Sequence, residues 1–140
     1  MSRYRIAVIP GDGIGTEVIE QSLITLRVLG EQFGISWDFT CFPWGSDNYF
    51  RHGELMPSDG LDTLASHDAI LFGAVGHPDI DDHITLNSLL LPIRQGFDQY
   101  VCVRPNKHYS GIKSPLSGKT SGEIDIVIIR ENTEGEYANI

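Results

Sequence analysis

The sequence predicts an α/β fold with a mainly parallel sheet, flanking helices and a non-Rossmann connection after the first strand. Apolar runs at 6–9, 69–72 and 124–129 have the length and composition of buried strands. Segments with helical periodicity separate the first two runs, as in parallel sheets covered by helices. Glycines follow the first run with the spacing G-x-G-x-G, whereas the dinucleotide-binding fingerprint requires G-x-G-x-x-G.

The first strand is expected at 5–10, followed by the glycine-rich turn 11–15 and a helix. Glycine permits positive φ and close backbone approach in this turn, and Glu17 would lie where the helix macrodipole favours an acid. The helix is expected to end at Gly30 or Gly34. Its buried face would carry Ile19, Leu23 and Leu26. Taken alone, such a turn is better explained as a purely structural feature.

Alternating apolar and polar residues at 35–42 predict a second strand. Residues 43–58 lack sustained periodicity, so we expect a loop that contains a short helical piece. Ser58 or Asp59 can cap the next helix, and a third strand is expected at 69–72.

A short helix is expected to begin at Thr85 or Ser88 and to end at Gly96. Pro92 would lie inside its first turn or kink it, because proline lacks the N–H that a helix interior needs. Arg94 would emerge near the C-terminal end of this helix. The buried stripe would consist of Leu86, Leu89, Leu90 and Ile93.

A further strand is expected at 98–103, with Arg104 at its far edge. Pro105 would end the strand pairing because it has no backbone donor. Residues 106–123 are rich in turn signals, which predicts a mobile connection or a crossing between domains. The run at 124–129 would then form another buried strand.

Composition disfavours several classes of partner. The chain has 140 residues, and its net charge of −9 disfavours nucleic acid and anionic membrane surfaces. Two cysteines, Cys41 and Cys102, without a signal peptide favour reduced thiols in the cytoplasm. No segment approaches the roughly 20 apolar residues that a membrane span needs.

Three arginines lie among apolar and aromatic residues in a chain that has only 10 Lys and Arg. They are Arg94, Arg104 and Arg130. This placement favours a small anion-binding pocket, because the guanidinium fork matches a carboxylate bidentately and stays charged. The alternative is that each arginine forms a weak surface ion pair with a nearby Asp or Glu.

The segment after the third expected strand has two features of interest. Residues 73–76, GAVG, follow the carboxyl end of that strand, where open α/β sheets bind their ligands. A group of possible metal ligands comes next, namely Asp79, Asp81, Asp82 and His83. Because nothing in the sequence fixes a coordination geometry, a solvated loop is favoured and no metal ligand is assigned.

Four motifs occur in order along the chain: PGDGIG at 10–15, GAVG at 73–76, R-x9-RP at 94–105 and RENTEGEY at 130–137. Together they resemble the N-terminal part of the β-decarboxylating dehydrogenases, the family of isocitrate, isopropylmalate, tartrate and D-malate dehydrogenases. The resemblance covers essentially the whole chain and implies part of the isopropylmalate-dehydrogenase-like fold. Residues 1–98 would belong to the cofactor-side domain, and residues 99–140 would begin the substrate and dimerisation domain.

The resemblance also implies roles for individual residues. The three arginines match those that hold the carboxylates of a 2-hydroxy acid, and Tyr137 matches the general acid. Ser88 falls at a substrate-contacting serine of isocitrate dehydrogenases, and Leu90 stands where those enzymes carry an asparagine. The residues near NAD would be Ile14, Gly73, Ala74, Val75 and Gly76.

Residues 97–105 and 44–61 are most similar to the tartrate and D-malate branch. Two departures leave the substrate pocket open: Cys102-Val103 replaces the usual Asn-Leu, and residues 86–88 replace a segment that often has a Trp and a Gly. Leu90 disfavours isocitrate, while isopropylmalate-type specificity stays an alternative. The sequence leaves open which 2-hydroxy acid is the substrate and whether the cofactor is NAD or NADP.

In the resembled family, NAD-dependent oxidation gives a 2-oxo acid whose β-carboxylate leaves as CO2. Mn2+ or Mg2+ polarises the C2 oxygen, and the tyrosine protonates the resulting enol. The metal-binding aspartates, the catalytic lysine and most adenine-binding residues lie beyond position 140. The chain is therefore expected to be a fragment or truncated product that lacks activity by itself.

Assembly and alternative functions follow from the same resemblance. The family forms homodimers, and an incomplete sheet would leave an open edge that favours self-association. One alternative is a non-catalytic carboxylate-binding or assembly module that retained the arginines. Another is a non-functional truncation product whose site residues are relics.

Overall fold

The computed structural model describes residues 2–135, and the chain divides into two compact units, Met1–Ile93 and Arg94–Ile140. Within residues 2–135, none of the helices combines the length and apolarity needed to cross a membrane. The assignment of residues 1–98 and 99–140 to a cofactor-side and a substrate domain stays a prediction.

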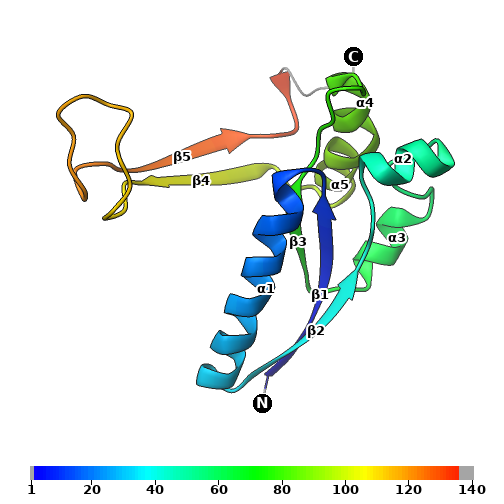
Figure 1. Cartoon of the computed structure of the whole chain (residues 1–140). Helices are drawn as coiled ribbons and strands as arrows, with labels where there is room; N and C mark the ends of the chain where they lie inside the picture. Colours follow the sequence, from blue (N-terminus) through cyan, green and yellow to red (C-terminus); the bar gives the residue numbers. More distant parts are fainter. Residues whose placement is uncertain (1, 136–140) are drawn as a thin grey trace. The chain divides into compact units, whose positions relative to one another are not determined.

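The first unit contains a three-stranded parallel sheet of order β2-β1-β3, which confirms the predicted α/β class. Helix α1 runs along this sheet, and α2 and α3 lie on its other side (Figure 1). The elements of this unit are β1 (Ser2–Gly11), α1 (Ile14–Phe33), β2 (Ile35–Cys41), α2 (Ser46–His52), α3 (Gly60–Ala65), β3 (Ala69–Ala74), α4 (Asp82–Thr85) and η1 (Leu86–Leu90). Helix α5 (Leu91–Gly96) begins in this unit and ends in the second.

The central strand β1 is buried on both faces. Residues 6–9 are at most 8% exposed. Ile6 and Val8 pack against Ile19 of α1, and the alternation of side chains along a strand turns Ala7 and Ile9 to the opposite face. A parallel strand covered on both faces needs a continuous apolar run, which is what the sequence shows at this point.

Helix α1 ends at the second of the two expected glycines. Gly34 has the left-handed conformation, φ 68° and ψ 33°, and its N–H donates to the carbonyl of Gly30. Gly30 serves packing instead, because a Cβ there would lie 2.7 Å from the Ile35 carbonyl oxygen. The indole N–H of Trp37 donates to the Leu26 carbonyl at 2.7 Å and ties β2 to this end of α1.

The helical stretch after β3 begins at Asp82, earlier than the predicted Thr85 or Ser88, and it ends at Gly96 as expected. Its middle part, η1, is a π-helical turn in which the Leu91 N–H donates to the Leu86 carbonyl. Pro92 explains this turn, because its ring would clash with the carbonyl four residues earlier in an α-helix and it offers that carbonyl no donor.

The predicted stripe of this stretch is buried only in part. Leu89 and Ile93 are 0% and 4% exposed, and Leu90 is half-buried. The prediction for Leu86 is wrong, since this side chain is 39% exposed. A π-helical turn has more residues per turn than an α-helix, so an α-helical periodicity misplaces side chains across it.

The second unit contains an antiparallel pair of strands, β4 (Val101–Lys107) and β5 (Asp125–Glu131). Pro105 does not end the pairing as predicted, because it lies inside β4 opposite Val127. Both strands of a two-stranded ribbon are edge strands, where proline is tolerated. Residues 106–123 therefore connect neighbouring strands, and the predicted crossing between domains is wrong.

The prediction that the run at 124–129 is buried is also wrong. Ile126 is 54% exposed and Ile129 is 63% exposed. The run has the composition of a core strand, yet within the described residues it belongs to a ribbon of only two strands. A ribbon of this size cannot bury both of its faces by itself.

The pKa of Glu123, in the turn before β5, is lowered below the usual value of 4.5 because its carboxylate accepts hydrogen bonds from the side chain and the backbone of Thr120. A carboxyl group with a depressed pKa stabilises the folded turn above the unfolded pKa, and this contribution disappears as the pH falls through the folded pKa. Carbon-detected NMR titration is expected to place the Glu123 midpoint below 4.5. Thr120→Val should raise it, and an unchanged midpoint in that variant would contradict the assignment.

Candidate functional site

Two loops meet at the carboxyl edge of the parallel sheet: the turn 11–15 after β1 and residues 73–76 at the end of β3. The Asp12 N–H donates to the Ala74 carbonyl at 2.7 Å. A Cβ on Gly11 would lie 1.8 Å from that carbonyl oxygen, and Gly11 has a φ of 70°. Only glycine permits this approach, so the motifs PGDGIG and GAVG fit together as one backbone-to-backbone contact.

Two more glycines of these motifs, Gly15 and Gly73, make similarly close backbone contacts. Gly15 is buried, and a Cβ there would lie 2.5 Å from the Ala74 nitrogen. A Cβ on Gly73 would lie 2.2 Å from the Pro10 carbonyl oxygen. Three glycines in two distant motifs therefore serve a single purpose, which is to let helix α1 begin directly against the end of β3.

The carboxylate of Asp12 joins these loops to a third segment. Its Oδ1 accepts a hydrogen bond from the Ser46 N–H at 2.7 Å, and its Oδ2 accepts one from the Ser46 hydroxyl at 2.6 Å. The same Oδ2 accepts a hydrogen bond from the Gly76 N–H at 2.8 Å. Ser46, at the start of α2, is only 1% exposed, whereas Asp12 is half-buried and Gly76 is exposed, so the network reaches from the folded core to the surface.

Sequence reasoning did not identify Asp12 or Ser46. The aspartate between two glycines of the first motif was the available signal, because a carboxylate in a partly buried turn usually has hydrogen-bond donors around it. Ser46 carried no such signal, since its contact with Asp12 spans 34 positions of sequence.

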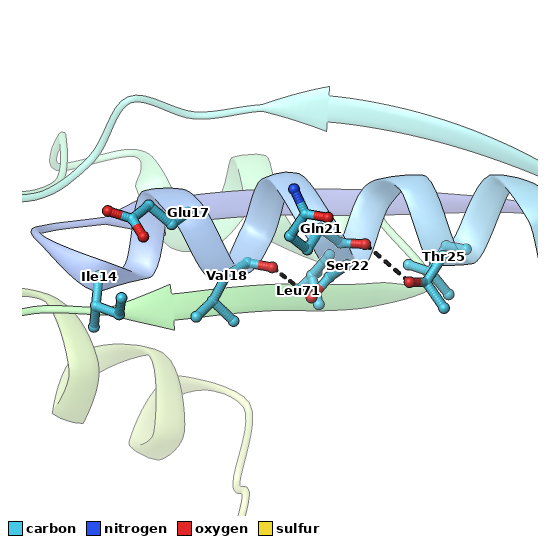
Figure 2. Close-up of a pocket in the computed structure, with 8 residues that line it drawn as sticks. Ile14, Glu17, Val18, Gln21, Ser22, Thr25 and Leu71 are labelled. Carbon is cyan, nitrogen blue, oxygen red and sulfur yellow. Dashed lines mark hydrogen bonds between the residues drawn. The ribbon is translucent and has the colours of Figure 1, made fainter. Parts of the chain in front are cut away.

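Ile14, the first residue of α1, lies at this carboxyl edge of the sheet. The strand order changes direction at β1, since the chain passes from β1 to β2 and then back to β3 on the other side. Ligands of open α/β sheets bind at such switch points. The Ile14 side chain is 65% exposed, and with Val18 it projects from one side of α1 beside β3 (Figure 2). The structure thus brings Ile14 and the Gly73–Gly76 loop to one place.

Ser88 and Leu90 lie on the π-helical turn η1. Ser88 is exposed and Leu90 is half-buried, while Leu89 between them is fully buried. The buried leucine therefore anchors the turn and leaves the Ser88 hydroxyl accessible.

Arg104 and Arg130 share one face of the β4–β5 ribbon. Arg104 pairs with Ile128, and Cys102 pairs with Arg130, so the two arginines are diagonal neighbours on adjacent strands. Side chains in such positions have Cβ atoms about 7–8 Å apart, within reach of one small dianion.

Arg94 lies near the end of α5, and its carbonyl accepts a hydrogen bond from the Gln99 N–H at 2.8 Å. The N–H of Asn132, two residues after Arg130, donates a hydrogen bond to the Tyr100 carbonyl at 2.9 Å. The Asn132 side chain is buried, and within residues 2–135 its Oδ1 has no hydrogen-bond partner. Backbone contacts therefore link the turn after Arg94 to the end of β5. Tyr137 lies outside the described residues.

A metal site is not formed by the described residues. No three His, Cys, Asp or Glu side chains among residues 2–135 come close enough to hold an ion. In the acidic segment, Asp79 Oδ2 lies 3.8 Å from His77 Nδ1, and Asp81 Oδ2 lies 4.0 Å from His83 Nδ1. Both aspartate side chains are 80% exposed. This segment has the geometry of a solvated loop.

The parallel sheet, the two glycine motifs in mutual contact and the arginine pair are consistent with one family of enzymes. Residues 5–140 match the isocitrate/isopropylmalate dehydrogenase family, and the chain belongs to that family. Its relatives include a probable tartrate dehydrogenase/decarboxylase of Agrobacterium vitis, 55% identical over 99% of this chain and 39% of the relative. The D-malate dehydrogenase [decarboxylating] of Escherichia coli K12 is 46% identical over 100% of this chain and 39% of that enzyme.

Solved structures agree with this placement. The isocitrate dehydrogenase of Methylococcus capsulatus aligns with a TM-score of 0.74 at 27% identity, over 98% of this chain and 37% of the other. A β-decarboxylating dehydrogenase of Thermococcus kodakarensis gives 0.64 at 31% identity, over 94% of this chain and 35% of the other. The chain spans about 39% of the length of the curated relatives named above.

Proposed function

We propose that this chain provides the N-terminal part of an NAD-dependent dehydrogenase that oxidises and decarboxylates a small 2-hydroxy dicarboxylic acid of the tartrate or D-malate type. The observation that carries the proposal is 55% and 46% identity, over almost the whole chain, to proteins named tartrate and D-malate decarboxylating dehydrogenases. The motif residues quoted above all lie within the matched region.

The arginines would bind the carboxylates of the substrate. The register that puts Arg104 and Arg130 on one face suits a dianion whose carboxylates each accept a bidentate guanidinium contact. Arg94 would add a third contact. Fixing both ends of a small acid orients its C2 hydrogen, which is the main contribution that binding residues make to such a reaction.

The edge around Ile14 fits the nicotinamide part of the cofactor. When bound, NAD accepts the hydride that leaves C2 of the substrate. An exposed isoleucine offers an apolar surface to a flat ring, and the backbone of Gly76 is exposed, with no atom within 4 Å of a Cβ placed on it. Ser88 and Leu90 would line the substrate side, and Tyr137 would protonate the carbon from which CO2 departs.

Several parts of the proposal concern a longer protein. The described residues supply no metal site, so the ligands of Mn2+ or Mg2+ would come from the rest of the longer protein. We expect this chain to show no turnover by itself, because it spans only about 39% of its relatives. Homodimerisation and a cytoplasmic location stay predictions, and the sequence leaves open whether the cofactor is NAD or NADP.

Isothermal titration of the chain with D-malate and with tartrate, with and without Mn2+, tests the arginine site. The double variant Arg94→Ala, Arg104→Ala should weaken binding at least about 30-fold, because it removes charge-assisted hydrogen bonds. The control Lys107→Ala, Lys119→Ala removes the same charge from the same unit and should bind normally.

An equal loss of affinity in both double variants would mean that the acids bind to positive charge in general and not to these arginines. Undiminished binding by the arginine variant would reject the substrate assignment. If the folded wild-type chain binds neither acid, the arginine pocket requires the remainder of the longer protein. Binding without turnover in a full-length relative carrying these 140 residues would favour a carboxylate-binding module over an enzyme.

A further inference from the structure

We propose that Asp12 is a positioning residue of the nicotinamide site, whose carboxylate fixes the Gly76 amide and thereby the conformation of the loop Gly73–Gly76. The inference rests on the proposed function, because that function gives this loop to the cofactor. Asp12 would act through the loop and would itself touch neither cofactor nor substrate.

The loop needs a further hydrogen bond because its backbone leaves the sheet before Gly76. Pairing between β1 and β3 ends at Gly11 and Ala74. Beyond that point the Gly76 N–H donates to Asp12, while the His77 ring packs against Phe50 with centroids 5.1 Å apart. Gly76 is exposed and has a φ of 149°, so its conformation is not imposed by packing around it. The hydrogen bond to Asp12 therefore sets where its amide points.

A carboxylate suits this position because it accepts hydrogen bonds at both oxygens and donates none. Asp12 Oδ2 accepts from the Ser46 hydroxyl and the Gly76 N–H at the same time, at 2.6 Å and 2.8 Å. Oδ1 accepts from the Ser46 N–H. Three donors from two distant segments converge on one side chain, which matches the acceptor capacity of an ionised carboxyl group.

The arrangement also explains how α2 is coupled to the loop. Gly45 precedes Ser46, and a Cβ on Gly45 would lie 2.7 Å from Asp12 Oδ1. The start of α2 thus encloses the carboxylate from one side, and Gly76 closes it from another. Asp12 is half-buried, and its carboxylate connects the start of α2 to the loop through separate hydrogen bonds, two from Ser46 and one from the Gly76 N–H.

The isosteric variant Asp12→Asn distinguishes the hydrogen bonds of Asp12 to Ser46 from its hydrogen bond to Gly76. If its amide oxygen takes the place of Oδ1, it still accepts from the Ser46 N–H, and its NH2 can donate to the Ser46 hydroxyl, which can act as an acceptor. That NH2 then faces the Gly76 N–H, so two donors oppose each other. The opposite amide orientation would restore the bond to Gly76 only by setting the NH2 against the Ser46 N–H. The matched control is Ser46→Ala, which removes one hydrogen bond from the same network and leaves the Gly76 link in place.

Amide hydrogen exchange by NMR and NADH binding by fluorescence form the test, on folded chains verified by circular dichroism. Asp12→Asn should speed exchange of the Gly76 amide at least about 10-fold and weaken NADH binding by a similar factor. Ser46→Ala should leave both within about twofold. A Gly76 amide that stays protected in Asp12→Asn, or equal effects of the two variants, would overturn the inference.

A second variant covers the case in which Asp12→Asn does not fold. Gly76→Ala strains the loop from its other end while Asp12 keeps its partners at Ser46, and no neighbouring atom lies within 4 Å of the added Cβ. It should weaken NADH binding with little loss of stability; unchanged binding would overturn the role of the loop conformation. If the wild-type chain binds no NADH, the cofactor site requires the remainder of the longer protein, and the exchange rate of the Gly76 amide in Asp12→Asn alone decides whether Asp12 holds the loop.

Discussion

Gly11→Ala is expected to lower the free energy of unfolding of the first unit by at least about 3 kcal/mol, because its Cβ would meet backbone that cannot yield. The Cβ would lie 1.8 Å from the Ala74 carbonyl oxygen and 2.8 Å from the Ala74 carbonyl carbon. That carbonyl is already bound by the Asp12 N–H at 2.7 Å, so moving it would break a contact between the two motif loops. Positive φ adds about 1–2 kcal/mol of backbone strain.

Gly34→Ala isolates the strain from the steric conflict. Gly11 and Gly34 have nearly the same φ, 70° and 68°, but no atom lies within 4 Å of a Cβ placed on Gly34. The control should therefore cost only about 1–2 kcal/mol. Both tryptophans, Trp37 and Trp44, lie in the first unit, so urea unfolding followed by their fluorescence reports the relevant transition. Equal losses for the two variants would show that the interlocked glycines carry no steric constraint.

Leu89→Ala is expected to cost about 2–5 kcal/mol, whereas Leu86→Ala, three residues earlier, should cost less than about 1 kcal/mol. Leu89 is 0% exposed and Leu86 is 39% exposed. Both leucines belong to the π-helical turn, so the two substitutions change helix propensity equally and differ only in the cavity that they create. The same fluorescence-detected urea titration measures both.

This pair also tests the geometry of the turn. An ordinary α-helix from Leu86 to Ile93 would place Leu86 on the stripe of Leu89, Leu90 and Ile93, as the sequence predicted. Comparable destabilisation by both variants would mean that the stretch is α-helical in solution. A large difference would support the π-helical turn that presents Ser88 to solvent beside an anchoring leucine.

Much of the first unit was predictable because local patterns and burial agree there. The apolar run in β1 is a direct consequence of strand burial, and Gly34 ends α1 through a conformation that glycine adopts readily. The motif loops were also found, since each directly follows a strand. Their mutual contact was not, because it joins residues about 60 positions apart, such as Asp12 and Gly76.

The sequence by itself determined the family and the parallel sheet, and it predicted the candidate site residues other than Asp12 and Ser46, because these depend on motifs and on periodicity within single elements. Only the tertiary structure decided that Asp12 binds the Gly76 amide, that Arg104 and Arg130 share a face, and that β5 is exposed. Pairing register, enclosure of a carboxylate and burial of a strand are properties of what lies beside a residue in space. Neighbours along the chain do not specify them, so residue types alone left them open.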